Sequence, residues 1–347
     1  MNELIMEDAI TIAETELPWE RLNGKTIFIT GANGYVPQYF VHGFLKRNDL
    51  YSSGIKVIGM CRDEQRANER FAEYKNRTDF ELYIGDVRDK VGHEGNVDYI
   101  IHAASPAGQI SRYEDPVATF DTNVIGCKNM LEFAKQNKAE FLLISSIDIY
   151  GNQSSTDRLT EDSHGSLDPL SPRNIYSCAK RAAETLCAAY SQEGIVCKIS
   201  RPSQILGGGV AIDDGRLHAD FIRQLKSGDS ITLKGDGTPL RTFIYITDAI
   251  SALLTIMLKG KNGEAYNVVD ETNEATVLQL IKTFISCVKT REISIKYDMT
   301  ARQNDPAVTK AISVVCGDSS KLRGLSWKPY VSLETACDRL LKFYNVK

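Results

Sequence analysis

The stretch Thr30-Gly31-Ala32-Asn33-Gly34-Tyr35-Val36-Pro37 decides which fold we expect for this chain. It follows a short apolar run, residues 26–29, that is typical of a buried parallel strand, and it precedes residues 38–46, where apolar side chains recur at helical spacing. A glycine-rich turn between a strand and a helix offers free N–H groups and the positive end of the helix dipole to a phosphate. The stretch therefore predicts the first β-α turn of a dinucleotide-binding domain, rather than an ordinary structural glycine turn.

The positions within this turn have different expected roles. Gly31 allows the tight turn, and Gly34 lets the backbone approach a pyrophosphate. Pro37 occupies the position where Gly or Ala usually permits close packing of helix on strand, although proline is compatible with the first turn of a helix. The packing there is expected to differ. The cofactor contacts predicted in this turn are Gly31, Asn33, Gly34, Tyr35 and Val36.

Composition excludes several classes of partner. The length of 347 residues suits one large domain, or two that share a core. The net charge of -4 gives no reason to expect nucleic acid or an anionic membrane as a partner. No apolar run approaches the ~20 residues of a membrane span, and residues 1–20 lack the pattern of a signal peptide. We therefore expect a cytoplasmic protein that does not bind a membrane.

The cysteines give no sign of a metal site. All eight are scattered along the chain without a CxxC pair or a Cys/His cluster. In a long chain without a predicted export signal, such thiols are expected to be reduced and mostly buried. The sequence therefore predicts no bound metal.

A second predicted strand, residues 56–60, ends at Cys61-Arg62-Asp63. An NAD site usually has an acid near this strand end for the ribose hydroxyls, whereas a cation suits the additional 2′-phosphate of NADP. Arg62, with Arg66 one helical turn further on, favours NADP. The alternative is that Arg62 is a solvated loop residue and that Asp63 serves the ribose of NAD.

Two further predicted strands, residues 82–84 and 97–101, extend the same domain. An Asp at the end of a third strand is placed to hydrogen-bond the adenine amino group, and small residues after the fourth strand leave room for the cofactor. We expect His102 to be a hydrogen-bonded structural histidine, because better acid–base candidates follow downstream. The cofactor contacts predicted after these two strands are Asp86, Val87, Ala103 and Ala104.

The candidate catalytic residues come from two segments. A predicted strand at residues 140–144 runs into Ser146 and Asp148, which share one face if the extended conformation continues that far. Tyr176 and Lys180 are four residues apart at the start of an alanine-rich helix, so they share a helical face.

This combination suits hydride transfer at a secondary alcohol or ketone. A tyrosine hydroxyl ionises near pH ~10, and a nearby ammonium group favours the phenolate. Tyr176 can then exchange a proton with a substrate oxygen that Ser146 holds. A YxxxK pair alone is common and is often a surface pair, but a serine at a strand end and a glycine turn upstream make chance a poor explanation.

Taken together, these residues resemble the extended short-chain dehydrogenase/reductases that modify nucleotide sugars, over nearly the whole chain after Asn23. The resemblance extends to residues 201–207, 213–216, 235–248 and 325–329, with a particular likeness to UDP-glucuronate decarboxylases around residues 104–106 and 214–216. The catalytic residues that it implies are Tyr176, Lys180, Ser146 and Asp148, of which the first two also contact the cofactor. The substrate contacts that it implies are Ser105, Gln204, Arg216 and Arg241.

The resemblance also implies the architecture. We expect an α/β fold, a Rossmann doubly wound parallel sheet with a smaller C-terminal α/β substrate lobe. The parts that it implies are an NAD(P)-binding domain at 24–202, to which 242–260 returns, and a nucleotide-sugar-binding lobe at 203–241 and 261–347. The N-terminal extension at 1–23 precedes the resemblance, and its own residues favour a packing cap. A homodimer through the helices around 123–133 and 176–190 is implied as well.

Three departures from the family pattern bear on the reaction. Ile147-Asp148 replaces the Asp-Glu pair of the nucleotide-sugar dehydratases, so dehydration lacks its usual acid. Decarboxylases carry Glu where this chain has the shorter Asp148. The asparagine of the family's substrate strand is Gln204 here, so the sugar contacts are expected to be altered.

The expected NADP preference then favours net reduction, because decarboxylases and 4-epimerases regenerate their nicotinamide and commonly keep NAD bound. Our leading hypothesis is an NADPH-dependent reductase of a 4-keto-6-deoxy nucleotide sugar in surface polysaccharide precursor synthesis. The alternatives are a nucleotide-sugar 4-epimerase or UDP-glucuronate decarboxylase with recycled NAD, and a non-catalytic dinucleotide-binding protein.

Overall fold

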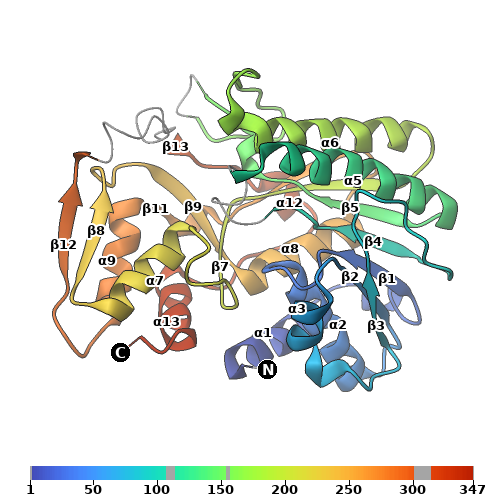
Figure 1. Ribbon diagram of the computed structural model, residues 1–347, viewed down its shortest axis with the longest axis horizontal. Helices are drawn as coiled ribbons and strands as arrows, with labels where there is room; N and C mark the ends of the chain where they lie inside the picture. Colours follow the sequence, from blue (N-terminus) through green and yellow to red (C-terminus); the bar gives the residue numbers. More distant parts are fainter. Residues whose placement is uncertain (1, 107–113, 154–156, 301–313, 347) are drawn as a thin grey trace.

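The computed structural model describes residues 2–106, 114–153, 157–300 and 314–346. Its centre is a seven-stranded parallel sheet with the strand order β10-β6-β5-β4-β1-β2-β3 (Figure 1). The strands of this sheet are β1 (Thr26–Thr30), β2 (Lys56–Cys61), β3 (Phe80–Ile84), β4 (Tyr99–His102), β5 (Glu140–Ile144), β6 (Cys197–Pro202) and β10 (Ala265–Val268).

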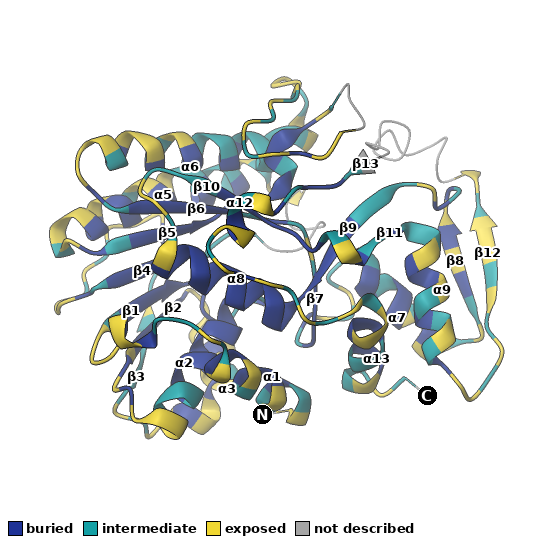
Figure 2. Cartoon of the chain, turned by 180° about the vertical axis from the view of Figure 1, so that it is seen from behind, coloured by how far each residue is buried: buried dark blue, intermediate teal, exposed yellow. Residues whose placement is uncertain are grey.

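Helices cover both faces of this sheet. Helices α5 and α6 lie on one face, and α1, α2 and α8 lie on the other (Figure 1). Figure 2 shows that the strands and α8 are largely buried, while α5 and α6 are exposed along their outer sides. The expected doubly wound α/β fold is confirmed. The helices of this half are α1 (Glu3–Glu14), α2 (Pro37–Tyr51), α3 (Glu64–Arg70), α5 (Pro116–Asn137), α6 (Ile175–Gln192) and α8 (Ile246–Lys259).

The apolar run in β1 explains why this strand lies at the centre. Ile27 and Ile29 belong to the hydrophobic core on one side of the sheet, and Phe28 belongs to the core on the other side. All three side chains are fully buried. Successive side chains of a strand point to opposite faces, so only a strand covered on both faces can bury such a continuous apolar run.

The N-terminal extension packs against α2 of the Rossmann half. Helix α1 lies on α2 so closely that a Cβ at Gly43 would be 2.5 Å from Cγ2 of Ile12. Trp19 follows α1, and its ring makes an edge contact with Phe44 of α2. Pro37 is the first residue of α2, the position that proline tolerates.

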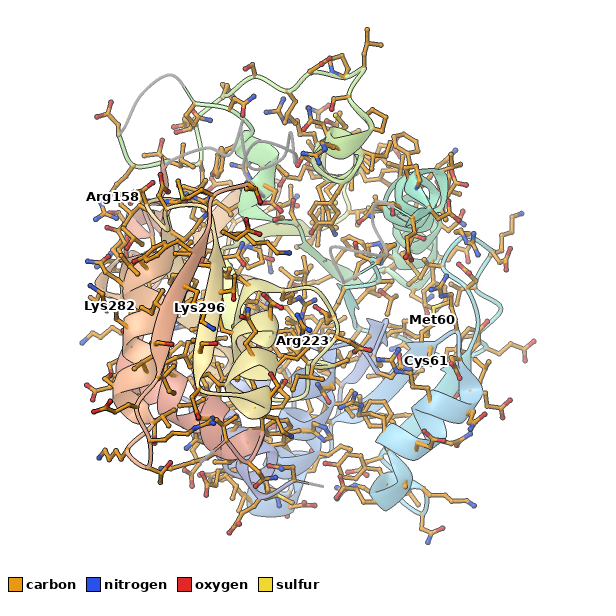
Figure 3. All side chains as sticks on the ribbon, turned by 60° about the vertical axis from the view of Figure 1, so that its left-hand side comes forward. Met60, Cys61, Arg158, Arg223, Lys282 and Lys296 are labelled. Atoms are coloured by element: carbon orange, nitrogen blue, oxygen red, sulfur yellow. The ribbon has the colours of Figure 1, made fainter. Side chains whose placement is uncertain are left out.

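The remaining elements form a lobe beside the large sheet. Strands β11-β9-β13 form one sheet, with β7 also paired to β9, and β8 and β12 form a separate parallel pair. In Figure 3, Arg223, Lys282 and Lys296 mark this lobe, whereas Cys61 marks the end of β2 in the Rossmann half. The elements of the lobe are β7 (Gln204–Leu206), α7 (Leu217–Ser227), β8 (Ser230–Lys234), β9 (Leu240–Tyr245), β11 (Glu274–Thr276), α9 (Val277–Cys287), β12 (Ser294–Asp298), β13 (Val314–Val315) and α13 (Leu333–Phe343).

Two boundaries differ from those expected from the sequence. Residues 265–268 were expected in the lobe, but they form β10 of the large sheet because they pair in parallel with β6. Residues 242–245 were expected to return to the Rossmann half, but they are part of β9 in the lobe sheet, and only α8 returns. Both differences arise from strand pairings between residues far apart in the chain.

Candidate functional site

The site lies where the order of the large sheet reverses. Strand β1 has β2 on one side and β4 on the other, and ligands of open α/β sheets bind outside the carboxyl ends of the strands at such a point. Gly31 follows β1 with a φ of +65°, and a Cβ there would lie 3.1 Å from Cα of Ala104. At Gly34 a Cβ would lie 2.9 Å from the carbonyl oxygen of Gly31. Both positions therefore require glycine.

Thr30 holds the chain that leaves β4. Its Oγ1 accepts hydrogen bonds from the N–H groups of Ala103 and Ala104, each at 3.0 Å. The same oxygen lies 3.0 Å from Nδ1 of His102. His102 is fully buried, and burial, with the charge of Lys180, lowers the pKa of its imidazole to about 3. His102 is thus a neutral, hydrogen-bonded histidine, as expected.

The residues predicted for the adenosine end lie together at the ends of β2 and β3. Arg62 Nη1 is 3.8 Å from Oδ2 of Asp86, and the Arg62 side chain is 63% exposed. Arg88 Nη2 binds the same carboxylate oxygen at 2.7 Å, which lowers the pKa of Asp86. Asp63 instead accepts the N–H of Arg66 as the N-cap of α3.

Val87 contributes packing next to these residues. It is buried, and a Cβ at Gly126 of α5 would lie 2.6 Å from its Cγ2. The absence of a side chain at Gly126 therefore lets α5 pack closely on Val87.

The strand before Ser146 ends too early for Ser146 and Asp148 to share a strand face, which the sequence had suggested. Strand β5 ends at Ile144, and Ser146 is the N-cap of a 3-10 helix, η3 (Ile147–Tyr150). Its Oγ accepts the N–H of Asp148 at 3.1 Å. Asp148 therefore does not share a strand face with Ser146, because the serine cap turns the backbone into a helical conformation.

Tyr176 and Lys180 lie in the first turns of α6, as expected from their spacing. The buried ammonium group of Lys180 donates to the carbonyl of Ile144 at 2.8 Å, and it lies 5.8 Å from the centre of the Tyr176 ring. Lys180 therefore connects α6 to the end of β5, two residues before Ser146.

A cavity of about 130 Å³ lies next to this arrangement. Asp148 and Arg241 both line it. Burial lowers the pKa of the Arg241 guanidinium, and the negative charge of Asp148 partly opposes this shift. Gln204 at the start of β7 lines it too. Three of the predicted catalytic and substrate residues thus meet at one cavity. The complete lining is Ile147, Asp148, Ser203, Gln204, Arg241, Thr242 and Val315.

Other predicted site residues lie outside this cavity. Tyr35 has a buried side chain, and the guanidinium of Arg216 lies 4.8 Å from the centre of its ring. Arg216 also pairs with Asp214 at 3.1 Å. The glycine turn is therefore in direct contact with the lobe. Ser105 follows β4, and its buried Oγ has no hydrogen-bond partner among the described residues.

Sequence reasoning missed Ile147, Ser203, Thr242 and Val315 as cavity residues. Ser203 has a buried Oγ without a hydrogen-bond partner among the described residues, which suits a ligand contact. Ser203 and Thr242 adjoin the predicted residues Gln204 and Arg241, so proximity in the sequence was an available signal. Val315 had no such signal, because it reaches the cavity only through the pairing of β13 with β9.

These residues fit a bound nicotinamide dinucleotide. The glycine turn leads into α2 at the switch point, and the first N–H groups of a helix have no intrahelical acceptor. With Ser146, Tyr176 and Lys180 beside it, the arrangement defines a nicotinamide-dependent enzyme of the short-chain dehydrogenase/reductase type. The chain belongs to the NAD dependent epimerase/dehydratase family, which matches residues 27–269.

Comparison with known proteins agrees with this classification. The chain is 31% identical over 328 residues to UDP-glucuronic acid decarboxylase 1 of Danio rerio, covering 92% of this chain and 73% of that protein. Its fold is similar to that of dTDP-glucose 4,6-dehydratase of Bacillus anthracis in complex with NAD, with a TM-score of 0.77, 22% identity, and coverage of 92% and 96%. RMD of Pseudomonas aeruginosa complexed with NADPH has a TM-score of 0.69, 22% identity, and coverage of 92% and 98%.

Over the part of the chain that the structure describes, none of the helices combines the length and apolar character needed to cross a membrane.

Proposed function

We propose that this enzyme reduces the 4-keto group of a nucleotide-linked 4-keto-6-deoxy sugar with NADPH. The observation that carries the proposal is the contact of Lys180 with the end of β5, which brings the helix of Tyr176 beside Ser146 and the adjoining cavity. A bound nicotinamide supplies the hydride in this chemistry. The side chains of this protein then have to hold the sugar oxygen and deliver a proton to it.

The proposed roles follow from the chemistry of each side chain. Tyr176 donates its phenolic proton to the sugar oxygen as the carbonyl carbon receives hydride. Lys180 provides a positive charge that favours the resulting phenolate. Ser146 Oγ accepts the Asp148 N–H, so its own hydroxyl proton can be donated to the sugar oxygen. Asp148 and Arg241 are proposed to contact the substrate from the cavity wall.

The proposed NADP preference is supported by the different surroundings of the adjacent residues Arg62 and Asp63. Asp63 caps α3, whereas Arg62 remains 63% exposed at the end of β2. A guanidinium group there suits a 2′-phosphate, which it can bind with two parallel hydrogen bonds.

The first experiment is to identify any nicotinamide that purifies with the protein. NADPH oxidation is then followed by absorbance with a panel of 4-keto nucleotide sugars. Stoichiometric loss of NADPH is the expected result. Tightly held NAD without net oxidation would contradict net reduction.

Replacing Tyr176 by Phe removes the proposed proton donor while keeping the ring. We expect the Tyr176→Phe variant to bind NADPH as the wild type does and to lose turnover by roughly 100-fold or more, because positioned acid–base groups contribute that much. Binding is measured by cofactor fluorescence and turnover by absorbance. Full activity in this variant would disprove the assignment, and inactivity of the wild type on every nucleotide sugar would favour a non-catalytic dinucleotide-binding protein.

A second candidate is a UDP-glucuronate decarboxylase or a 4-epimerase with recycled NAD. The observation that favours it is the similarity over 92% of this chain to a protein named UDP-glucuronic acid decarboxylase 1. Carbon dioxide release from UDP-glucuronate, or interconversion of C4 epimers, without net NADPH consumption would establish it.

Further proposals concern assembly and localisation. We propose that the Rossmann half holds the cofactor, that the lobe holds the nucleotide sugar through Arg216 and Arg241, and that the protein is cytoplasmic.

We also propose a homodimer through α5 and α6. Ile125 on α5 is 42% exposed, which suits such an interface. Light scattering of the purified protein tests the dimer.

A further inference from the structure

A short C-terminal segment, residues 314–319, contributes Val315 to the cavity lining, and we call it the wall segment. Its strand β13 pairs in parallel with β9, which places Val315 opposite Arg241. Both residues line the cavity. Because cross-strand partners share a face of the sheet, Val315 and Arg241 form one continuous surface toward the sugar.

The wall segment is packed tightly against the residues that follow the active-site serine. Ile147, Leu159 and Val269 belong to one small buried cluster, against which Val315 packs. At Gly317 a Cβ would lie 2.9 Å from Cγ1 of Val269 and 3.2 Å from Cδ1 of Ile147. A shift of the wall segment would therefore change the shape of the cavity next to Ser146.

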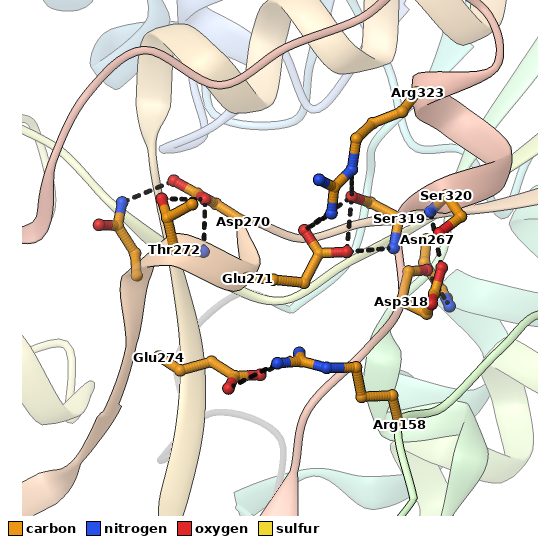
Figure 4. Close-up of polar contacts among 11 residues, drawn as sticks. Arg158, Asn267, Asp270, Glu271, Thr272, Glu274, Asp318, Ser319, Ser320 and Arg323 are labelled. Atoms are coloured by element: carbon orange, nitrogen blue, oxygen red, sulfur yellow. Dashed lines mark hydrogen bonds and ion pairs between the residues drawn. The ribbon is translucent and has the colours of Figure 1, made fainter.

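Two sets of hydrogen bonds fix the backbone of this segment. Leu159 donates its N–H to the carbonyl of Cys316 at 2.8 Å and accepts the N–H of Asp318 at 2.9 Å. Glu271 accepts the N–H of Ser319 at 2.7 Å (Figure 4). The first set ties the wall segment to the stretch that contains Leu159, so the position of that stretch matters for the cavity.

An ion pair anchors that stretch to the lobe sheet. Arg158 donates from both terminal nitrogens to the carboxylate of Glu274 in β11, with Nη2 3.0 Å from Oε2 (Figure 4). Glu274 lies opposite Thr242 of β9. Burial and the neighbouring Glu274 raise the pKa of the Cys316 thiol to about 11, and Arg158 also acts on this thiol. The carboxylate that Arg158 binds therefore also contacts the Cys316 thiol, which directly follows Val315 in the wall segment.

We propose that the Arg158–Glu274 ion pair is a positioning strap that holds the wall segment in the shape that binds the sugar. Arg158 is a positioning residue, since it acts through Val315 and Arg241 and does not touch the substrate. The identity of the ligand in this inference rests on the proposed function. The strap itself is a property of the fold and can be tested without turnover.

The test reverses the charge of Arg158 and then restores the ion pair by reversing the charge of Glu274 as well. Arg158→Glu places two carboxylates against each other, and we expect the KM for the nucleotide sugar to rise roughly tenfold with little change in kcat or in NADPH binding. The double variant Arg158→Glu/Glu274→Arg restores the attraction and should restore KM. The control is Arg291→Glu, which breaks the Arg291–Asp229 pair in the same lobe, away from the cavity lining, and should leave KM unchanged.

The second readout is alkylation of Cys316 by N-ethylmaleimide, followed by peptide mass spectrometry. Cys316 is 4% exposed beneath the strap, so it should react slowly in the wild type, roughly tenfold faster in Arg158→Glu, and slowly again in the double variant. The half-buried Cys178 and Cys287 serve as internal references that should react equally in all variants.

The outcomes separate the two proposals. Faster Cys316 labelling that the double variant reverses, in a protein that turns over no nucleotide sugar, would support the strap and count against the proposed function. Unchanged Cys316 labelling and unchanged KM in Arg158→Glu would overturn the strap whatever the reaction. A changed KM that the double variant fails to restore would also overturn it.

Discussion

At the scale of single residues, hydrogen bonding decides which of two adjacent side chains is available to a ligand. Arg62 and Asp63 were both candidates for the ribose of the cofactor. Asp63 accepts the N–H of Arg66 and caps α3, whereas Arg62 points to solvent 3.8 Å from Asp86. A carboxylate used as an N-cap stabilises the helix and is costly to withdraw, by about 1 kcal/mol. The local structure therefore leaves the largely exposed Arg62 guanidinium more available to a ligand than the Asp63 carboxylate.

Replacing Arg62 by Ser tests this argument. If its guanidinium binds the 2′-phosphate, we expect the KM for NADPH to rise by roughly 10- to 100-fold, the size of a charge-assisted hydrogen bond. The KM for NADH, which lacks this phosphate, should stay the same and serves as the control. Equal changes for both cofactors would show that Arg62 acts on the fold and not on the phosphate.

At the scale of elements, glycine sets how closely helices approach their neighbours. Helix α1 packs on α2 at Gly43, where a Cβ would meet Ile12 at 2.5 Å. Helix α5 approaches the chain after β3 at Gly126, where a Cβ would meet Val87 at 2.6 Å. Cores are packed so densely that one added methyl group requires neighbours to move. The N-terminal extension is therefore fitted to α2 and is part of the same core.

The Gly43→Ala substitution distinguishes packing from helix propensity. Alanine favours a helix over glycine by roughly 1 kcal/mol, but the clash with the stiff β-branched Ile12 should outweigh this and lower the free energy of unfolding by about 1–2 kcal/mol. In an Ile12→Ala background, the same substitution should become stabilising. Urea unfolding measures both. Stabilisation by Gly43→Ala in the wild-type background would show that α1 does not pack there.

At the scale of the whole molecule, burial keeps three histidines neutral in three different elements. His42 is in α2, His102 is in β4 and His218 is in α7, and burial is the main cause that lowers the pKa of each to about 3. Asp8 of α1 shows the opposite shift. It is bound by Tyr245 and Arg339, and burial raises its pKa to about 6.

These shifts predict how stability depends on pH. A histidine whose pKa is lowered in the folded state contributes stability above about pH 6.5, and this is lost as pH falls toward the folded value. The raised pKa of Asp8 has the opposite effect on stability. Because the folded protein favours protonated Asp8, this group lowers the free energy of unfolding as pH rises through about 6. Near pH 5.5, unfolding should therefore take up about two protons, and the free energy of unfolding should fall by roughly 2–3 kcal/mol per pH unit.

Urea unfolding between pH 6.5 and 5 measures this slope. The Asp8→Asn variant removes the opposing group, so its slope should increase to about three protons. A free energy of unfolding that stays constant over this range would mean that the three histidines are not held neutral.

Short-range features of the sequence predicted the Rossmann half well. The glycine turn, the buried strands before and after it, and the Tyr176–Lys180 spacing depend on residues within one or two turns of each other, and the structure has these elements where they were expected. Local rules failed where a single residue redirected the backbone. Ser146 caps η3, so the backbone is helical at Asp148, and the expectation that Asp148 shares a strand face with Ser146 was wrong.

The sequence by itself determined the parallel sheet, the dinucleotide turn and the family, because each is encoded by side-chain pattern over a short stretch. Only the tertiary structure decided which residues surround the sugar cavity. Val315 and Arg241 meet through the pairing of β13 with β9, and Arg158 reaches Glu274 across more than a hundred intervening residues. Such contacts depend on which strands become neighbours when the whole chain collapses. The physical reason is that strand pairing satisfies backbone hydrogen bonds irrespective of separation along the chain, so no local pattern specifies it.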